Sequence, residues 1–64
     1  MRYYRLYFID SLGHIEDVRE CMLADDAAAI AEARRLNHAS VIEIWCQGSK
    51  IVDVEPGKLR RRFS

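Results

Sequence analysis

One alanine-rich segment, residues 25–36, constrains the fold more than any other part of the sequence. Asp25 is a good N-cap for a helix, because its carboxylate can accept a backbone N–H two or three residues further on. The residues that follow are strong helix formers without proline or glycine, and Asn37 is a suitable end for the helix. A period of 3.6 residues places on one face Ala29, Ile30, Ala33 and Leu36. Because that face consists mostly of methyl groups, the helix can lie close to a sheet.

The residues before this helix predict two strands joined by a turn. Residues 3–9 are aromatic or branched at most positions and alternate with a period of two, which is typical of a strand. Turn-forming residues follow at 10–13, where Gly13 is free to adopt a positive φ. Residues 14–20 predict a second strand, but their apolar pattern is weaker and a loop is the alternative.

The second predicted strand needs an irregularity. Its main apolar residues, Ile15 and Val18, are an odd number of positions apart, so strict alternation would put them on opposite faces. A β-bulge or an irregular segment near Asp17 would reconcile these two positions with one strand.

Two further strands are predicted after the helix. Residues 41–46 are dominated by Val, Ile and Trp, and residues 49–55 follow a two-residue turn at Gln47-Gly48. In the register set by that turn, the expected cross-strand pairs are Trp45 with Lys50 and Ile44 with Ile51. Pro56-Gly57 ends the last strand, because proline cannot supply the next hydrogen bond of the ladder.

The order of these elements predicts an α+β fold of the ββαββ type, with one antiparallel sheet and one helix packed on one of its faces. We expect a single domain at residues 1–57, followed by a basic, flexible C-terminal tail at residues 58–64. The domain contains six basic and ten acidic side chains, whereas the tail adds four basic ones, Lys58, Arg60, Arg61 and Arg62. The body is therefore acidic, unlike the basic face of a dedicated nucleic-acid-binding fold.

Aromatic side chains are expected on the sheet face away from the helix. Tyr3, Tyr7 and Ile9 belong to this face by alternation, with Trp45 as a further member. A chain of 64 residues has a marginal core, and an aromatic patch is costly to leave in water. We therefore expect a homodimer that buries this face or pairs edge strands.

The sequence has few residues that carry chemistry. Its cysteines and histidines, which are Cys21, Cys46, His14 and His38, do not have the spacing of zinc ligands. No catalytic or phosphate-binding motif is present in the sequence. Acidic residues near His14 could support acid–base chemistry, but a solvated turn histidine is the simpler interpretation. His38, just past the helix, is interpreted as a helix-end residue. We predict no enzymatic activity, no catalytic residue, no metal and no cofactor.

The N-terminal residues alternate charged and aromatic side chains, and no apolar run reaches the length of a signal-peptide core or a membrane span. A cytoplasmic location without membrane association is therefore expected. In that compartment thiols stay reduced, so no disulfide between the two cysteines is expected.

Three stretches of the sequence form a recognisable set. They are an aromatic first strand at residues 4–10 followed by Gly13-His14-Ile15, an alanine helix capped at Asp25-Asp26, and a closing Glu-x-Trp strand at residues 42–45 with Gly48. Together they resemble a group of small uncharacterised proteins frequent in alphaproteobacteria, over about residues 4–54. The resemblance implies a bacterial cytoplasmic setting and no particular activity, cofactor or site residue.

Two functions are open on this evidence. The first is a non-enzymatic module for protein–protein interaction or a homodimeric accessory protein, whose partner is a second copy or an unidentified protein. Its anchors would be Tyr3, Tyr7 and Trp45, residue types that are enriched in interface hot spots, unless they are simply half-buried sheet residues. The second is weak nucleic-acid binding, in which the basic tail would contact phosphates and the aromatic face would stack on bases.

Overall fold

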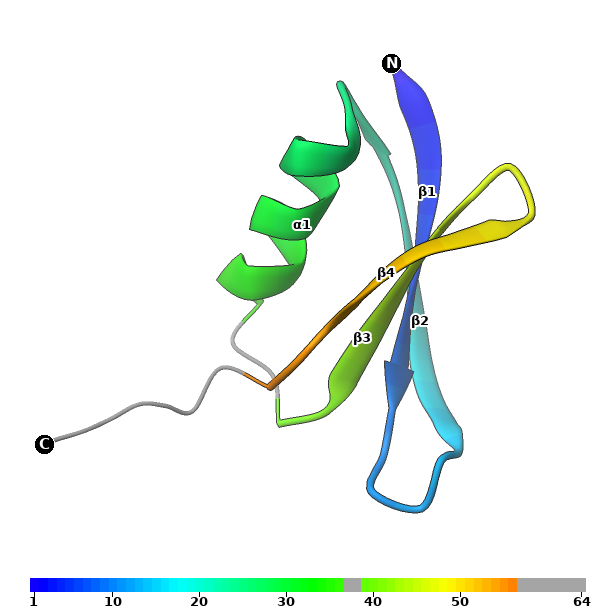
Figure 1. Cartoon of the computed structure of the whole chain (residues 1–64), viewed down its shortest axis with the longest axis vertical. Helices are drawn as coiled ribbons and strands as arrows, with labels where there is room; N and C mark the ends of the chain where they lie inside the picture. Colours follow the sequence, from blue (N-terminus) through cyan, green and yellow to red (C-terminus); the bar gives the residue numbers. More distant parts are fainter. Residues whose placement is uncertain (37–38, 57–64) are drawn as a thin grey trace, which may run out of the picture.

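Four strands form one antiparallel sheet in the spatial order β2-β1-β3-β4, and the helix lies on one side of it (Figure 1). The computed structural model describes residues 1–36 and 39–56 of the chain. In chain order the elements are β1 (Arg2–Ile9), β2 (Ile15–Leu23), α1 (Asp26–Arg35), β3 (Val41–Cys46) and β4 (Ser49–Val54). The predicted α+β class and the ββαββ order are therefore confirmed.

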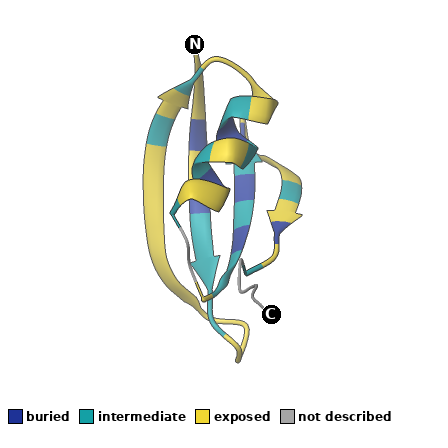
Figure 2. Ribbon diagram, turned by 90° about the vertical axis from the view of Figure 1, so that its left-hand side faces the viewer, coloured by how far each residue is buried: buried dark blue, intermediate teal, exposed yellow. Residues whose placement is uncertain are grey.

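The helix connects two strands that do not touch each other. β2 and β3 both run antiparallel to β1, which lies between them, so β2 and β3 are parallel to one another. A parallel pair needs a crossover connection, and α1 provides it by passing over the sheet from the edge strand β2 to the inner strand β3. The helix therefore lies in front of the middle of the sheet (Figure 2).

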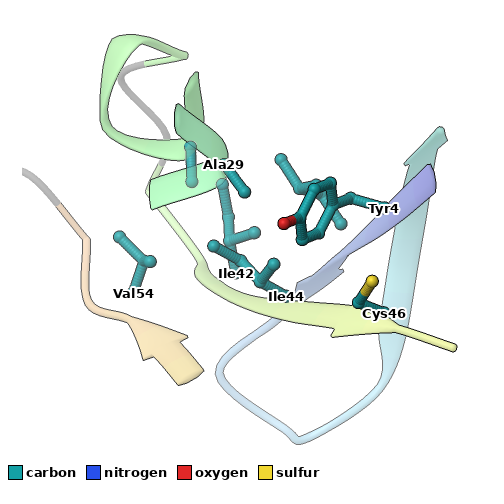
Figure 3. Close-up of a cluster of buried hydrophobic side chains, with 8 residues drawn as sticks. Tyr4, Ala29, Ile42, Ile44, Cys46 and Val54 are labelled. Carbon is teal, nitrogen blue, oxygen red and sulfur yellow. The ribbon is translucent and has the colours of Figure 1, made fainter. Parts of the chain in front are cut away.

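The core lies between α1 and the inner strands. Alternate residues of β1 and β3 point towards the helix, as the period of a strand requires, and several of them pack together in Figure 3. The buried residues are Tyr4, Leu6, Ala29, Ala33, Ile42, Ile44, Cys46 and Val54. Ala29 and Ala33 are fully buried, which confirms that a helix face made of methyl groups packs closely on the sheet.

Two side-chain hydrogen bonds fix the start of the helix. The Asp25 carboxylate accepts the backbone N–H of Ala28 at 2.9 Å, which confirms the predicted N-cap. In addition, the Tyr4 hydroxyl donates to Oδ1 of Asp26 at 2.6 Å and so joins β1 to the first turn of α1. Burial, together with the hydrogen bond to Asp26 and its charge, raises the pKa of Tyr4 to about 12.

The first hairpin contains the expected irregularity. Phe8 pairs with Asp17 and Ile9 pairs with Ile15, so Glu16 has no partner in the ladder and forms a bulge in β2. β2 is a regular strand beyond this point and ends at Leu23, three residues later than predicted. The extension follows from packing, because the half-buried side chains added there lie against the core.

The bulge also turns the outward residues of β2 to one side. Val18 lies opposite Tyr7, and Ile15 lies opposite Ile9, and these partners share the face of β1 away from the helix. Glu16 itself accepts a hydrogen bond from the hydroxyl of Ser40, which ties the bulge to the segment before β3.

The second hairpin turns through two residues with positive φ, Gln47 at 54° and Gly48 at 77°. This is the pattern of a type I′ turn, whose twist matches that of the flanking strands. Lys50 lies opposite Trp45, as predicted from the length of the turn.

One predicted pair in this hairpin is wrong. Ile44 lies opposite Val52 and not opposite Ile51, because Ile51 is an extra residue in β4. In an uninterrupted register Asp53 would lie opposite Ile42, on the side of the sheet that the helix covers. The extra residue turns Asp53 outwards and lets Val52 face inwards, so it avoids burying an unpaired carboxylate.

Several predictions fall outside the described residues. They concern Asn37 as the end of the helix, His38, and the basic tail with Lys58, Arg60, Arg61 and Arg62. In the part of the chain that is described, no helix has both the length and the apolar character needed to cross a membrane.

Replacing Ala33 by Leu tests the close approach of the helix. Extra methyl groups at this buried position should force the helix and sheet apart and reduce the free energy of unfolding by about 1–3 kcal/mol in urea denaturation. Ala31 is exposed on the same helix, so Ala31→Leu is a matched control that should change the free energy of unfolding by less than about 0.5 kcal/mol. Equal effects of the two substitutions would contradict the packing described above.

The raised pKa of Tyr4 predicts that the protein loses stability at alkaline pH. The pKa of the Tyr4 phenol is about 12 in the folded state, whereas its usual value is 10.0. Between these two pH values the folded state binds more protons than the unfolded state, so the free energy of unfolding falls as the pH rises. In Tyr4→Phe, the urea midpoint of unfolding should fall less steeply as the pH rises through this range. The substitution should also lower the melting temperature at neutral pH by roughly 5 °C through the lost hydrogen bond. An unchanged alkaline slope in the variant would show that other groups cause the fall.

Candidate interaction site

The sheet face opposite α1, called the open face below, gathers side chains from all four strands. Strand alternation and pairing place on it Tyr3, Arg5, Tyr7 and Ile9 of β1, Ile15, Val18, Glu20 and Met22 of β2, Val41, Glu43 and Trp45 of β3, and Lys50 and Asp53 of β4. The three residues proposed as anchors from the sequence, Tyr3, Tyr7 and Trp45, therefore share one surface.

The centre of the open face is an aromatic pair on neighbouring strands. The rings of Tyr7 and Trp45 are 6.1 Å apart with an angle of 87° between their planes, which is the favourable edge-to-face arrangement. The indole Nε1 of Trp45 donates to the Glu43 carboxylate at 3.0 Å. The half-buried Trp45 is therefore held on two sides, and its orientation does not depend on a partner.

Arg5 is the residue that our sequence reasoning missed. Its Nε donates to the Tyr3 hydroxyl at 3.1 Å and its Nη1 donates to the Tyr7 hydroxyl at 3.3 Å. The guanidinium carbon also lies 5.7 Å from the centre of the Tyr3 ring, within range of a cation–π interaction. The hydrogen bonds that Arg5 donates to Tyr3 and Tyr7 raise the pKa of Arg5 above its usual range. The alternation Tyr3, Arg5, Tyr7 along β1 was the sequence signal for this cluster.

The two cations on the open face are both close to carboxylates of the same chain. Arg5 Nε lies 3.7 Å from Oε2 of Glu20 on the neighbouring strand. Lys50 Nζ lies 3.3 Å from the Asp53 carboxylate and 4.0 Å from that of Glu43. The open face therefore has no large field of a single sign.

Apolar exposure is concentrated on the β1–β2 half of this face. The exposed fractions are 61% for Ile15, 53% for Met22, 47% for Val18 and 43% for Tyr3. Ile15 and Val18 lie opposite the half-buried Ile9 and Tyr7, and these four side chains form an apolar patch that the helix cannot reach. Tyr3 and Met22 form a second apolar pair, which Arg5 and Glu20 separate from this patch.

The two edges of the sheet are less suited to association. β2 and β4 are the edge strands, and each contains a bulge, at Glu16 and at Ile51 respectively. Bulges and charged side chains hinder the addition of a further strand. Of the two surfaces considered from the sequence, the open face is therefore the one with more exposed apolar side chains and without bulged edges.

The environment of His14 is that of a turn. The Asp10 carboxylate accepts the backbone N–H groups of Leu12 and His14, both at 2.9 Å, and Gly13 has a φ of 85°. The His14 ring is largely exposed and its Nδ1 is 3.9 Å from Asp10. Among the residues described, no three or more His, Cys, Asp and Glu side chains come together as a candidate metal site.

The cysteines lie on either side of Tyr4 in the sheet. Cys21 pairs with Tyr4 from β2, and Cys46 pairs with Tyr4 from β3. Two strand spacings separate their Cα atoms by roughly 10 Å, beyond the reach of a disulfide. Both thiols are free, and burial, with a further contribution from the charge of Glu32, raises the pKa of the Cys21 thiol.

Comparisons of the chain with protein-family models, with curated proteins and with solved structures found no match. The resemblance to small alphaproteobacterial proteins therefore stays a prediction.

The cysteines should react slowly in the folded protein. Cys46 is buried and Cys21 is half-buried with a raised pKa, so an aromatic disulfide reagent at neutral pH should modify them at a small fraction of the rate seen in urea. Cys21→Ser leaves only the Cys46 thiol to react, and Cys46→Ser leaves only the Cys21 thiol, so the two reaction rates can be measured separately. Rapid modification of Cys21 without denaturant would contradict the half-buried position of its side chain.

Proposed function

We propose that the protein is a non-enzymatic interaction module that associates with a second copy of itself through the open face. The observation that carries this proposal is the apolar patch on β1 and β2, whose exposed side chains lie on the sheet face that the helix leaves uncovered. Such a patch marks an interaction surface more often than it is tolerated in water.

The area of the open face fits a weak dimer. A sheet of four strands with a spacing of ~4.8 Å and a rise of ~3.3 Å per residue offers on the order of 500 Å² per copy. Two such faces would bury about 1,000 Å², the lower limit for a specific interface. We therefore expect reversible association with a dissociation constant in the micromolar range or above, rather than an obligate dimer.

The charges of the open face support a second copy as the partner. A strongly charged face would call for a partner of opposite sign, but here Arg5 and Lys50 lie next to Glu20, Glu43 and Asp53 of the same chain. Two cations against three carboxylates leave the face with a net charge of −1, so an identical surface meets only a small net repulsion.

The same charges weigh against the nucleic-acid alternative. Glu20, Glu43 and Asp53 would face the phosphates of a nucleic acid stacked on the aromatic residues, and they would repel it. The Trp45 indole is also packed against Tyr7 and bonded to Glu43. The basic tail, on which this alternative depends, lies outside the described residues.

We also propose a cytoplasmic location. The support is chemical, because two free cysteines on a core face suit a compartment that keeps thiols reduced.

Val18→Glu tests self-association. Val18 lies in the apolar patch and is exposed, so a buried carboxylate there should weaken association at least tenfold while the free energy of unfolding changes by less than about 0.5 kcal/mol. Leu12→Glu is the matched control, because Leu12 is 78% exposed on the turn beyond the sheet. The measurement is sedimentation equilibrium over a concentration series, with urea denaturation of each variant.

Tyr7→Ala separates an interface role from a structural one. If Tyr7 is an anchor, this variant loses association more than stability; if Tyr7 only supports Trp45, it loses stability more than association. A chain that stays monomeric at the highest attainable concentration would refute the dimer outright.

A further inference from the structure

A hollow of about 310 Å³ opens on the end of the open face nearest the β3–β4 turn. It is lined by Tyr3, Arg5, Tyr7, Trp45, Gln47 and Gly48, and is called the aromatic hollow below. Its volume is at the lower end of the range for small-molecule sites. Three of the six lining residues are aromatic, and the one charged side chain among them is Arg5.

On the β1 side, the polar groups of the hollow are the guanidinium of Arg5 and the hydroxyls of Tyr3 and Tyr7. Arg5 donates from Nε and Nη1 to these hydroxyls, and its Nη2 donates to no other described residue. Because each phenol oxygen accepts from Arg5, its own O–H is directed elsewhere. A guanidinium and two phenol O–H groups on one side of a small hollow form a surface that favours an acceptor with negative charge.

The nearby carboxylates leave this position open. Glu20 approaches Arg5 at Nε and only to 3.7 Å, which is beyond a normal hydrogen bond. Glu43 is engaged with the indole N–H of Trp45 and, at 4.0 Å, with Lys50. Neither Glu20 nor Glu43 lines the hollow.

We propose that the aromatic hollow binds a small monocarboxylate that carries a flat apolar group. The carboxylate would accept from Arg5 and from the hydroxyls of Tyr3 and Tyr7, while the flat group lies against the Trp45 ring. Charge sign, donor geometry and the apolar walls together select this class over neutral or cationic ligands.

This binding activity goes beyond self-association, and the two compete, because Tyr3, Tyr7 and Trp45 lie on the face that a second copy would cover. The exposed apolar residues Ile15, Val18 and Met22 are not part of the lining. Val18→Gln therefore weakens association, keeps every lining residue and adds no carboxylate beside Tyr7 and Arg5, so the two proposals can fail separately.

Phenylacetate is a suitable probe, because it combines one carboxylate with one flat ring. A ligand with about ten non-hydrogen atoms should bind with a dissociation constant on the order of 1 mM. The titration is followed by the indole N–H resonance of Trp45 in the ¹⁵N spectrum of the full chain and of Val18→Gln. Phenylacetamide, which has the same shape without the charge, is the matched ligand control.

Three variants assign the binding to the hollow. Arg5→Gln should weaken phenylacetate binding at least about tenfold, and Arg5→Lys should weaken it less, because the charge stays but the fork of donors is lost. Lys50→Gln removes the other cation of the open face, outside the hollow, and should change binding by less than about twofold. The dispersion of each ¹⁵N spectrum verifies that the variant is folded.

The expected result is a saturable shift of the Trp45 resonance with phenylacetate. The dissociation constant of phenylacetamide should be at least about tenfold higher. Equal binding of the two ligands, or unchanged binding in folded Arg5→Gln, would overturn the proposal by removing the role of the charge. The absence of any shift up to about 20 mM phenylacetate would overturn it as well, since this exceeds the expected dissociation constant.

Discussion

The structure depends on one constraint, which is that a single short helix can cover only one face of the sheet. α1 has ten residues and is therefore about 15 Å long. Every buried side chain among the described residues lies in the layer between this helix and the sheet. The small residues Ala29 and Ala33 let the helix approach closely, and Tyr4 fills the middle of the layer while its hydroxyl reaches the first turn. The other face has no helix and must rely on its own side chains or on a partner.

Both bulges can be explained by this division. Each adds one residue to an edge strand and so exchanges the faces of everything beyond it. The bulge at Glu16 keeps Ile15 on the same face as Val18, and the bulge at Ile51 turns Asp53 away from the core. The cost is a local loss of ladder hydrogen bonds. The gain is that no charged residue is buried among the described residues, while apolar side chains accumulate on the open face.

Local patterns were sufficient to predict the elements but not all of their pairings. The cap at Asp25, the turn at Gln47-Gly48 and the bulge near Asp17 each follow from a few neighbouring residues, and all three were predicted correctly. The bulge at Ile51 was missed because it depends on what lies under the helix, which sequence neighbours do not report. The hydrogen bond between Tyr4 and Asp26 joins positions 22 apart, so no local pattern could reveal it. For the open face, alternation placed Tyr3, Tyr7 and Trp45 correctly, but the role of Arg5 required the three-dimensional arrangement.

The internal pairing of the charges determines how the open face can associate. A partner that covers Arg5 and Lys50 displaces few counterions, because carboxylates of the same chain already lie beside them. The proposed self-association would therefore gain its free energy from apolar area, respond weakly to salt and show a negative heat-capacity change. Binding to a nucleic acid would behave in the opposite way, since it releases counterions and weakens steeply with salt. The same intramolecular pairing that keeps the aromatic cluster ordered thus gives the two candidate functions opposite thermodynamic signatures.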